Sequence, residues 1–154
     1  MTAGKTDNAR GALLDSMNGL LADCFALYIK TKNFHWHVRG PQFRDLHLLF
    51  EEQAQAIFAL TDIIAERVRK NGADTLTSIG AIAAMTRVQD QDRSGLDAMA
   101  MADELRRDNE ALIARLREVK QAASEAGDNG TEGLIDDWTD QAELRVWFLS
   151  AIAA

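Results

Sequence analysis

The topology of this chain depends on the segment from Ala73 to Arg93, which reads ADTLTSIGAIAAMTRVQDQDR. The segment has no long amphipathic pattern, although residues 78–85 could form one or two turns of helix. On both sides of it, apolar residues recur at steps of three or four, as in amphipathic helices. We therefore interpret the segment as a crossover of about twenty residues between two pairs of helices.

Two long helices are predicted before the crossover. The apolar period marks the first from about Gly11 to His35. Gly40-Pro41 then breaks the pattern, because the residue before a proline disfavours the α region and proline favours the first turn of a helix. The second helix should run from near Gln42 to Lys70, where Asn71-Gly72 is a stop signal.

Two more helices are predicted after the crossover. Ser94, with Asp97 three residues later, resembles a capping box, and the helical period continues from there to Gly127. Thr131 is a candidate N-cap for a last helix that continues to the C-terminus. Two helix pairs joined by one long connection describe an all-α, ferritin-like four-helix bundle with a short helix in the crossover. A simple up-down bundle would need only short loops.

Composition indicates one soluble domain, which we place at residues 11–154 behind a short flexible tail of residues 1–10. The chain has 154 residues and is 47% hydrophobic, but it has no apolar run of the roughly 20 residues that cross a bilayer. The single Cys24 cannot form a disulfide within the chain, and the N-terminus does not resemble a signal peptide. We therefore expect a cytoplasmic protein without a membrane partner. The net charge of −7 favours cations over polyanions as ligands.

A di-iron site inside the bundle is not expected. Such sites use Glu-x-x-His on each of two helices and one Glu from each of the other two. The three histidines here all lie between positions 35 and 47, and none has Glu three residues before it. An in-bundle di-iron oxygenase therefore lacks its ligands.

The second helix instead carries four candidate metal ligands on one face: His47, Glu51, Asp62 and Glu66. At 100° per residue they fall at about 0°, 40°, 60° and 100° around the helix axis. At 1.5 Å of rise per residue, however, His47 and Asp62 are roughly 22 Å apart, too far to share one ion. One chain alone cannot close this site.

A homodimer could close it. A two-fold axis near residues 56–57 would set His47 and Glu51 of one copy against Asp62 and Glu66 of the other, giving two sites per dimer. His35 would lie near His47, just across the Gly40-Pro41 turn. Imidazole and carboxylate ligands suit Fe(II), Zn(II) or Mn(II), and redox chemistry favours iron.

These residues also resemble a known family, the Dps proteins, which are mini-ferritins named for DNA protection in starved cells. The resemblance rests on residues 33–43 (NFHWHVRGPQF), Leu46-His47, residues 50–52 (FEE) and residues 62–67 (DIIAER). It implies a hollow dodecamer that oxidises Fe(II), preferably with hydrogen peroxide, and stores ferric mineral as protection against oxidative damage. It also allows association with the nucleoid.

The resemblance implies roles for particular residues. His35, His47 and Glu51 match the ligands that one subunit supplies, and Asp62 and Glu66 match those of its two-fold mate. Trp36 matches a tryptophan beside the site that donates electrons and limits radical escape. Three acids match an acidic pore through which iron enters: Asp128, Glu132 and Asp136.

DNA binding is expected to be weak or absent. Residues 1–10 contain only Lys5 and Arg10 against Asp7, and the C-terminus ends in Ala-Ile-Ala-Ala. Twelve copies at −7 each would carry −84 charges, which phosphate groups would repel. The alternative is a shell that binds the nucleoid and has little iron chemistry.

Structural roles remain open for each candidate taken alone. His35 could be a core histidine, and His37 points away from His35 toward the surface. Asp62 and Glu66 could be a solvated acidic pair, and Glu66 could pair with Lys70. The acids after Gly127 could simply cap a helix.

Overall fold

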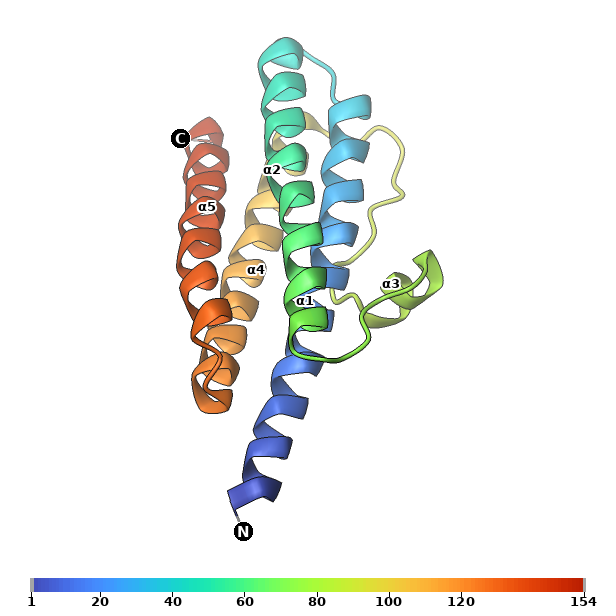
Figure 1. Ribbon diagram of the computed structural model, residues 1–154. Coiled ribbons are helices and arrows are strands. Elements are labelled where there is room, and N and C mark those ends of the chain that lie inside the picture. Colours follow the sequence, from blue (N-terminus) through green and yellow to red (C-terminus); the bar gives the residue numbers. More distant parts are fainter. Residues whose placement is uncertain (1, 154) are drawn as a thin grey trace.

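The computed structural model describes residues 2–153, with side chains from Asp7 onward, and their regular secondary structure is helical. Figure 1 shows the arrangement of the five helices. They are α1 (Thr2–His37), α2 (Phe43–Lys70), α3 (Ile79–Met85), α4 (Ala98–Ala126) and α5 (Asn129–Ala153). Met1 and Ala154 lie outside the described residues.

Four of these helices form the bundle, and the prediction of a ferritin-like fold is confirmed. Short turns join α1 to α2 and α4 to α5, so each pair is antiparallel, and α1 also packs against α4. Helix α2 touches α5 much less. The short α3 stands to the side of α1, inside the crossover (Figure 1). The largest fully buried side chains come from all four long helices and include Phe34, Phe50, Leu105 and Trp138.

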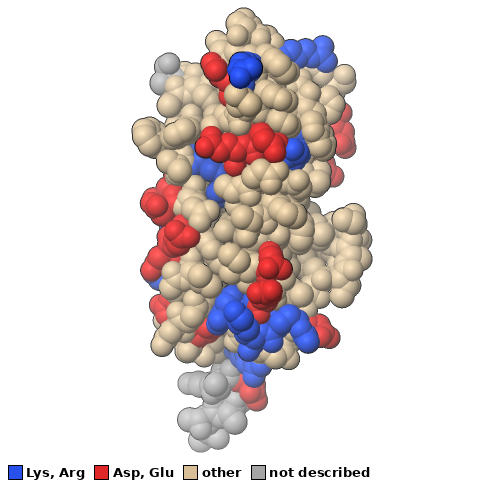
Figure 2. All heavy atoms as spheres, turned by 45° about the horizontal axis from the view of Figure 1, so that its top comes forward, with Lys and Arg blue, Asp and Glu red and all other residues tan. Residues whose placement is uncertain are grey.

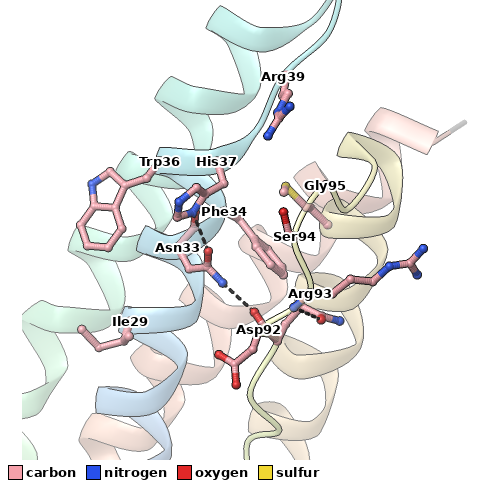
Figure 3. A pocket seen from close by; sticks show the side chains of 12 residues that line it. Ile29, Asn33, Phe34, Trp36, His37, Arg39, Asp92, Arg93, Ser94 and Gly95 are labelled. Carbon is pink, nitrogen blue, oxygen red and sulfur yellow. Dashed lines mark hydrogen bonds between the residues drawn. The ribbon is translucent and has the colours of Figure 1, made fainter.

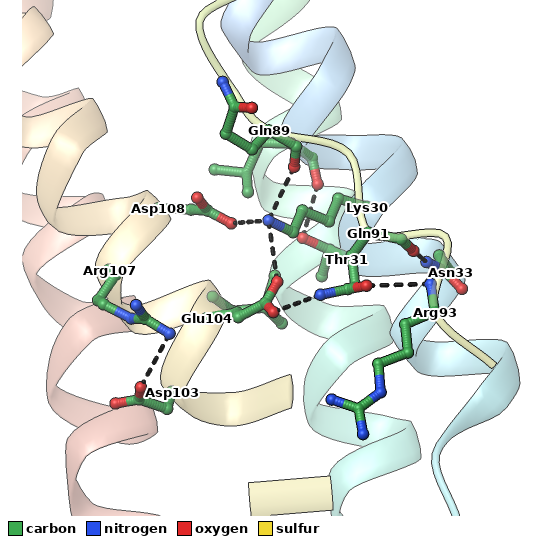
Figure 4. A network of polar contacts seen from close by, with 12 residues as sticks. Lys30, Thr31, Asn33, Gln89, Gln91, Arg93, Asp103, Glu104, Arg107 and Asp108 are labelled. Carbon is green, nitrogen blue, oxygen red and sulfur yellow. Dashed lines mark hydrogen bonds and ion pairs between the residues drawn. The ribbon is translucent and has the colours of Figure 1, made fainter. Parts of the chain in front are cut away.

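The crossover is held to the bundle by two buried charges of α1. Asp23 accepts hydrogen bonds from the Arg87 backbone N at 2.7 Å and from its guanidinium Nη2 at 2.6 Å. Lys30 donates to the backbone oxygen of Gln89 at 2.9 Å and lies 3.2 and 2.8 Å from carboxylate oxygens of Glu104 and Asp108 on α4. Figure 4 shows Lys30 at the centre of this network. These contacts fix a loop that has little apolar periodicity of its own.

Three helix starts differ from the sequence prediction. Helix α1 begins at Thr2 rather than near Gly11, so residues 2–10, expected as a tail, are helical; their mobility stays a prediction. The N-cap of α4 is Asp97, not Ser94, because the Asp97 carboxylate accepts from the Met99 N. Thr131 lies inside α5, and Asp128 caps that helix by accepting from the Thr131 N at 3.1 Å.

Helix α1 is also apolar enough, by length and composition, to span a membrane over Asp7–His37, with a mean hydropathy of 1.3. Half of the 18-residue apolar window within that stretch is buried in the protein, because α1 packs against both α2 and α4. A core helix of a bundle has this composition as well, so the apolarity is only weak support for a membrane span.

Candidate metal centre

His35 and His47 lie face to face where α1 ends and α2 begins. The turn between these helices includes Gly40 at φ 108°, a conformation that L side chains rarely adopt, and the Phe43 N donates to the Gly40 oxygen. The chain therefore reverses within a few residues and brings the two imidazoles together. Their ring centroids are 3.9 Å apart and the rings are 14° from parallel.

Reciprocal hydrogen bonds fix the orientation of both rings. His35 Nδ1 donates to the backbone oxygen of His47 at 2.6 Å, and His47 Nδ1 donates to the backbone oxygen of His35 at 2.7 Å. A carbonyl oxygen can only accept, so each neutral ring carries its proton on Nδ1 and keeps a lone pair on Nε2. This is the arrangement that outer hydrogen bonds commonly impose on metal-binding histidines.

Glu51 lies one turn beyond His47 on α2 and completes the group from this subunit. Its Oε2 is 3.2 Å from His35 Nε2 and also accepts from the Lys32 ammonium, while its Oε1 accepts from Gln55 Nε2 at 2.8 Å. The hydrogen bonds from Lys32 and Gln55 lower the pKa of Glu51 below its ordinary value. The carboxylate is therefore ionised, with a cationic group already beside it.

Asp62 and Glu66 lie farther along α2 and are exposed, whereas their neighbours Thr61 and Ile64 face the core. Over the part of the chain that the structure describes, no group of three or more His, Cys, Asp or Glu side chains is placed to hold a metal ion. A single subunit thus brings His35 next to His47 and next to Glu51 without arranging the three around one ion, and it leaves Asp62 and Glu66 apart from them.

The surface between these two groups is apolar. Phe58 is exposed on α2 and its ring lies 4.9 Å from that of Tyr28 on α1. Beside them, Ile29 and Ile79 are exposed and line a groove of about 310 Å³ between α1, α2 and the crossover. Figure 2 shows a broad face without charged side chains between acidic groups. An exposed apolar area of this kind is typical of a protein–protein interface.

Trp36 follows His35 directly and is 58% exposed. The Lys32 Nζ lies 5.6 Å from the centre of the Trp36 ring, so one lysine contacts both the tryptophan and Glu51. The indole is therefore next to the candidate ligands without being one of them.

His37 does not join the other two histidines. Its Nδ1 lies 2.7 Å from Asn33 Oδ1 and 2.8 Å from the Asn33 backbone oxygen. It faces a separate hollow of about 450 Å³ that Trp36, Arg39 and Arg93 also line (Figure 3). This position agrees with its assignment to the surface.

The three pore candidates differ in their surroundings. Asp128 is almost buried and bonds to Arg67 at 2.6 Å, to Asn71 and to the N-terminus of α5. Burial opposes its ionisation, but hydrogen bonds from Thr131 and Asn71 and the charge of Arg67 hold its pKa below the ordinary value. Asp136 is exposed and pairs with Lys120 at 2.5 Å, and Glu132 is half-buried. Asp128 therefore has the capping role that the bare sequence allowed.

Sequence reasoning missed Lys32 and Arg145. Lys32 lies three residues before His35, so its place on the same face of α1 was a usable signal. Arg145 is buried on the core-facing stripe of α5 with Trp138, Ala142 and Leu149, and the neighbouring Val146 fits the same apolar period. One charged residue on an otherwise apolar stripe was the available signal.

Comparison with known proteins assigns this fold to a family. Residues 14–154 match the ferritin family, described as a ferritin-like domain. The chain therefore belongs to the ferritin-like superfamily.

Individual relatives narrow the assignment. The structure of Dps from Thermosynechococcus elongatus superposes with a TM-score of 0.93 at 30% identity, covering 97% of this chain and 94% of that one. Dps from Vibrio cholerae, described as a member of a broad superfamily of ferritin-like diiron-carboxylate proteins, gives 0.89 at 27% identity, covering 96% and 92%. An uncharacterized low temperature-induced protein of Nostoc is 35% identical over 95% of this chain and 82% of its own length. The chain belongs to the Dps family.

Proposed function

We propose that this protein is a ferroxidase and iron-storage mini-ferritin. It oxidises Fe(II), preferably with hydrogen peroxide, between the subunits of two-fold dimers and stores ferric mineral in a hollow dodecamer in the cytoplasm. The observation that carries this proposal is the pair of imidazoles, His35 and His47, whose Nδ1 atoms are held by main-chain oxygens, together with the His35 Nε2 atom 3.2 Å from Glu51 Oε2. Asp62 and Glu66 of a second copy supply the remaining ligands.

The donor set fits Fe(II) as a substrate. Imidazole nitrogen and carboxylate oxygen together suit this ion, and a site with few protein ligands leaves room for an oxidant. Two Fe(II) ions give one electron each, and one hydrogen peroxide takes both electrons with two protons to form two waters. Because the electrons are transferred as a pair, no hydroxyl radical is released. Trp36, which follows His35 in the chain, donates an electron when only one iron is present.

Lys32 has a definite part in this scheme. In the metal-free subunit its ammonium lies beside the Glu51 carboxylate and balances the negative charge. The carboxylate therefore stays ionised and the side chain keeps its position. An entering Fe(II) must displace the Lys32 ammonium from Glu51 Oε2. The cation beside the carboxylate is then the substrate and no longer the lysine.

The apolar face of α1, α2 and the crossover supports the two-fold dimer. Its exposed side chains lie between the histidine end of α2 and the acidic end, where the two-fold axis must pass. A second copy that covers Phe58 and Ile63 also carries its acids to the first copy's histidines.

Iron entry is proposed to use acidic side chains of α5. We propose that Glu132 and Asp136 line the entry pore, with Asp128 holding the α5 end that bears them.

DNA binding is proposed to be weak or absent. The net charge of −7 per chain supports this, so protection acts through removal of Fe(II) and peroxide.

The test is anaerobic Fe(II) oxidation by the metal-free protein with added hydrogen peroxide, followed by separation by size. We expect fast oxidation, with ferric iron eluting with a large oligomer. His47→Ala and Asp62→Ala should each reduce the rate to that of buffer and leave the oligomer intact. His37→Gln is the matched control, because this third histidine lies outside the site. An intact wild-type oligomer that oxidises Fe(II) no faster than buffer would refute the proposal.

A further inference from the structure

One guanidinium in the interior of the bundle has no acidic partner within the described residues. Arg145 of α5 is only 3% exposed, and its Nε donates to Asn109 Oδ1 at 2.7 Å. Its Nη1 and Nη2 atoms are buried and have no hydrogen-bond partner. Buried charges in proteins are normally paired, because the cost of removing an ion from water is otherwise uncompensated.

The charge of Arg145 is not cancelled by its surroundings. Burial lowers the pKa of Arg145 to about 10, which leaves it protonated at neutral pH. Cys24 lies within electrostatic reach, but burial raises the pKa of its thiol to about 12, so the thiol stays neutral. Asn109 is a neutral amide whose Nδ2 donates to the Leu105 oxygen, and it serves to fix the plane of the guanidinium.

A groove between α2 and α5 is lined by Arg145 and by a second residue with an unsatisfied group. The groove has a volume of about 180 Å³, and Gln53 of α2, Arg145 and the exposed Glu52 line it. Gln53 Nε2 donates weakly to the Arg145 backbone oxygen at 3.4 Å, and its Oε1 is buried without a partner. The buried polar atoms without a partner here are thus two cationic donors, Nη1 and Nη2 of Arg145, and one neutral acceptor, Oε1 of Gln53.

We propose that Arg145 and Gln53 form a binding site for a small oxyanion that keeps a proton, such as hydrogen phosphate. Two deprotonated oxygens of this ligand accept from Nη1 and Nη2, and its hydroxyl donates to Gln53 Oε1. Leu144 and Phe148 stand at the groove and are half-exposed, so their side chains can turn aside to admit the ion. The site contains none of the proposed iron ligands and does not depend on the ferroxidase proposal.

The first test is equilibrium dialysis of the metal-free, full-length protein with radiolabelled inorganic phosphate at constant ionic strength. We expect one phosphate per chain for the wild type and none for Arg145→Met. Arg117→Gln is the matched control, because it removes one arginine from an exposed position on α4, and it should bind as the wild type does. Phosphate should raise the Tm of the wild type and the control in proportion to the logarithm of its concentration, and leave that of Arg145→Met unchanged.

Folding of the variant is checked in the same experiment. Without phosphate, Arg145→Met should melt at or above the wild-type Tm, because an apolar side chain of similar length replaces an unpaired buried charge.

A second variant tests the acceptor. Sulfate has no proton at neutral pH, so the wild type should bind hydrogen phosphate roughly ten-fold more tightly than sulfate, about the effect of one hydrogen bond. Gln53→Leu should abolish this preference while retaining anion binding. The proposal is overturned if the wild type binds no more phosphate than Arg145→Met. It is also overturned if Arg145→Met dissociates the oligomer on size exclusion, since an acidic group of another copy would then be the partner.

Discussion

Mixed assembly of two inactive variants is the sharpest test of a site shared between subunits. His47→Ala removes a ligand from the histidine half of the proposed site, and Asp62→Ala removes one from the acidic half. These side chains lie at opposite ends of one face of α2, so each subunit contributes one half to each of two sites in a dimer. Each variant alone should oxidise Fe(II) no faster than buffer.

The mixture should regain a defined fraction of activity. Random pairing at equal amounts makes half of the dimers heterodimers, and each heterodimer has one site with both halves intact and one with both halves damaged. About one quarter of all sites are then complete, so the mixture should show about 25% of the wild-type rate. The two variants are co-expressed with different affinity tags, and the doubly tagged assemblies are assayed anaerobically with peroxide.

The control and the refuting result are equally defined. Mixing the two separately folded variants just before the assay, without time for subunit exchange, should give no recovery. If co-assembled variants also recover nothing, although heterodimers are isolated and folded, each site lies within one subunit and the two-fold arrangement is wrong.

Three further predictions concern individual side chains. Lys32→Met should raise the pKa of Glu51 toward its ordinary value, because the leading cause of its depression is removed; the acid limb of the pH–rate profile should therefore move to higher pH. Asp128→Ala should lower the free energy of unfolding by about 2 kcal/mol in urea titrations, through loss of the α5 cap and of charge-assisted hydrogen bonds. Because the folded-state pKa of Asp128 is depressed, its contribution to the free energy of unfolding should be present above the ordinary pKa of Asp and be lost as the pH falls through the folded value. The control substitution Asp136→Ala, at an exposed position, should change the free energy of unfolding little. Cys24, fully buried with a pKa of about 12, should react with iodoacetamide only at the rate of unfolding, and faster labelling in the native state would contradict its burial.

Apolar periodicity and the Gly40-Pro41 break were sufficient to predict the helices, the crossover and the shared face of α2, because these depend on spacing along one chain. The starts of α4 and α5 were wrong, at Ser94 and Thr131. Several neighbouring residues there could cap a helix, and the choice depends on contacts from other segments, such as that of Arg67 with Asp128.

Contacts between helices were beyond what spacing can show. The approach of Lys32 to Glu51 depends on how α1 and α2 are rotated about their axes, and no pattern in either helix alone specifies that rotation. The hydrogen bonds between the two histidines depend on the path of the turn. Arg145 was missed because Val146 next to it satisfies the apolar period nearly as well.

The reciprocal bonds of His35 and His47 make these two residues thermodynamically coupled. Each ring is held by the main chain of the other, so losing one imidazole removes a candidate ligand and also loosens the segment that orients the second. Single substitutions should therefore cost nearly as much metal affinity as the double substitution, and the effects should be far from additive. The entropy of ordering both rings is lost during folding, before any ion arrives. Replacing either histidine during evolution would therefore disturb the position of the other one as well.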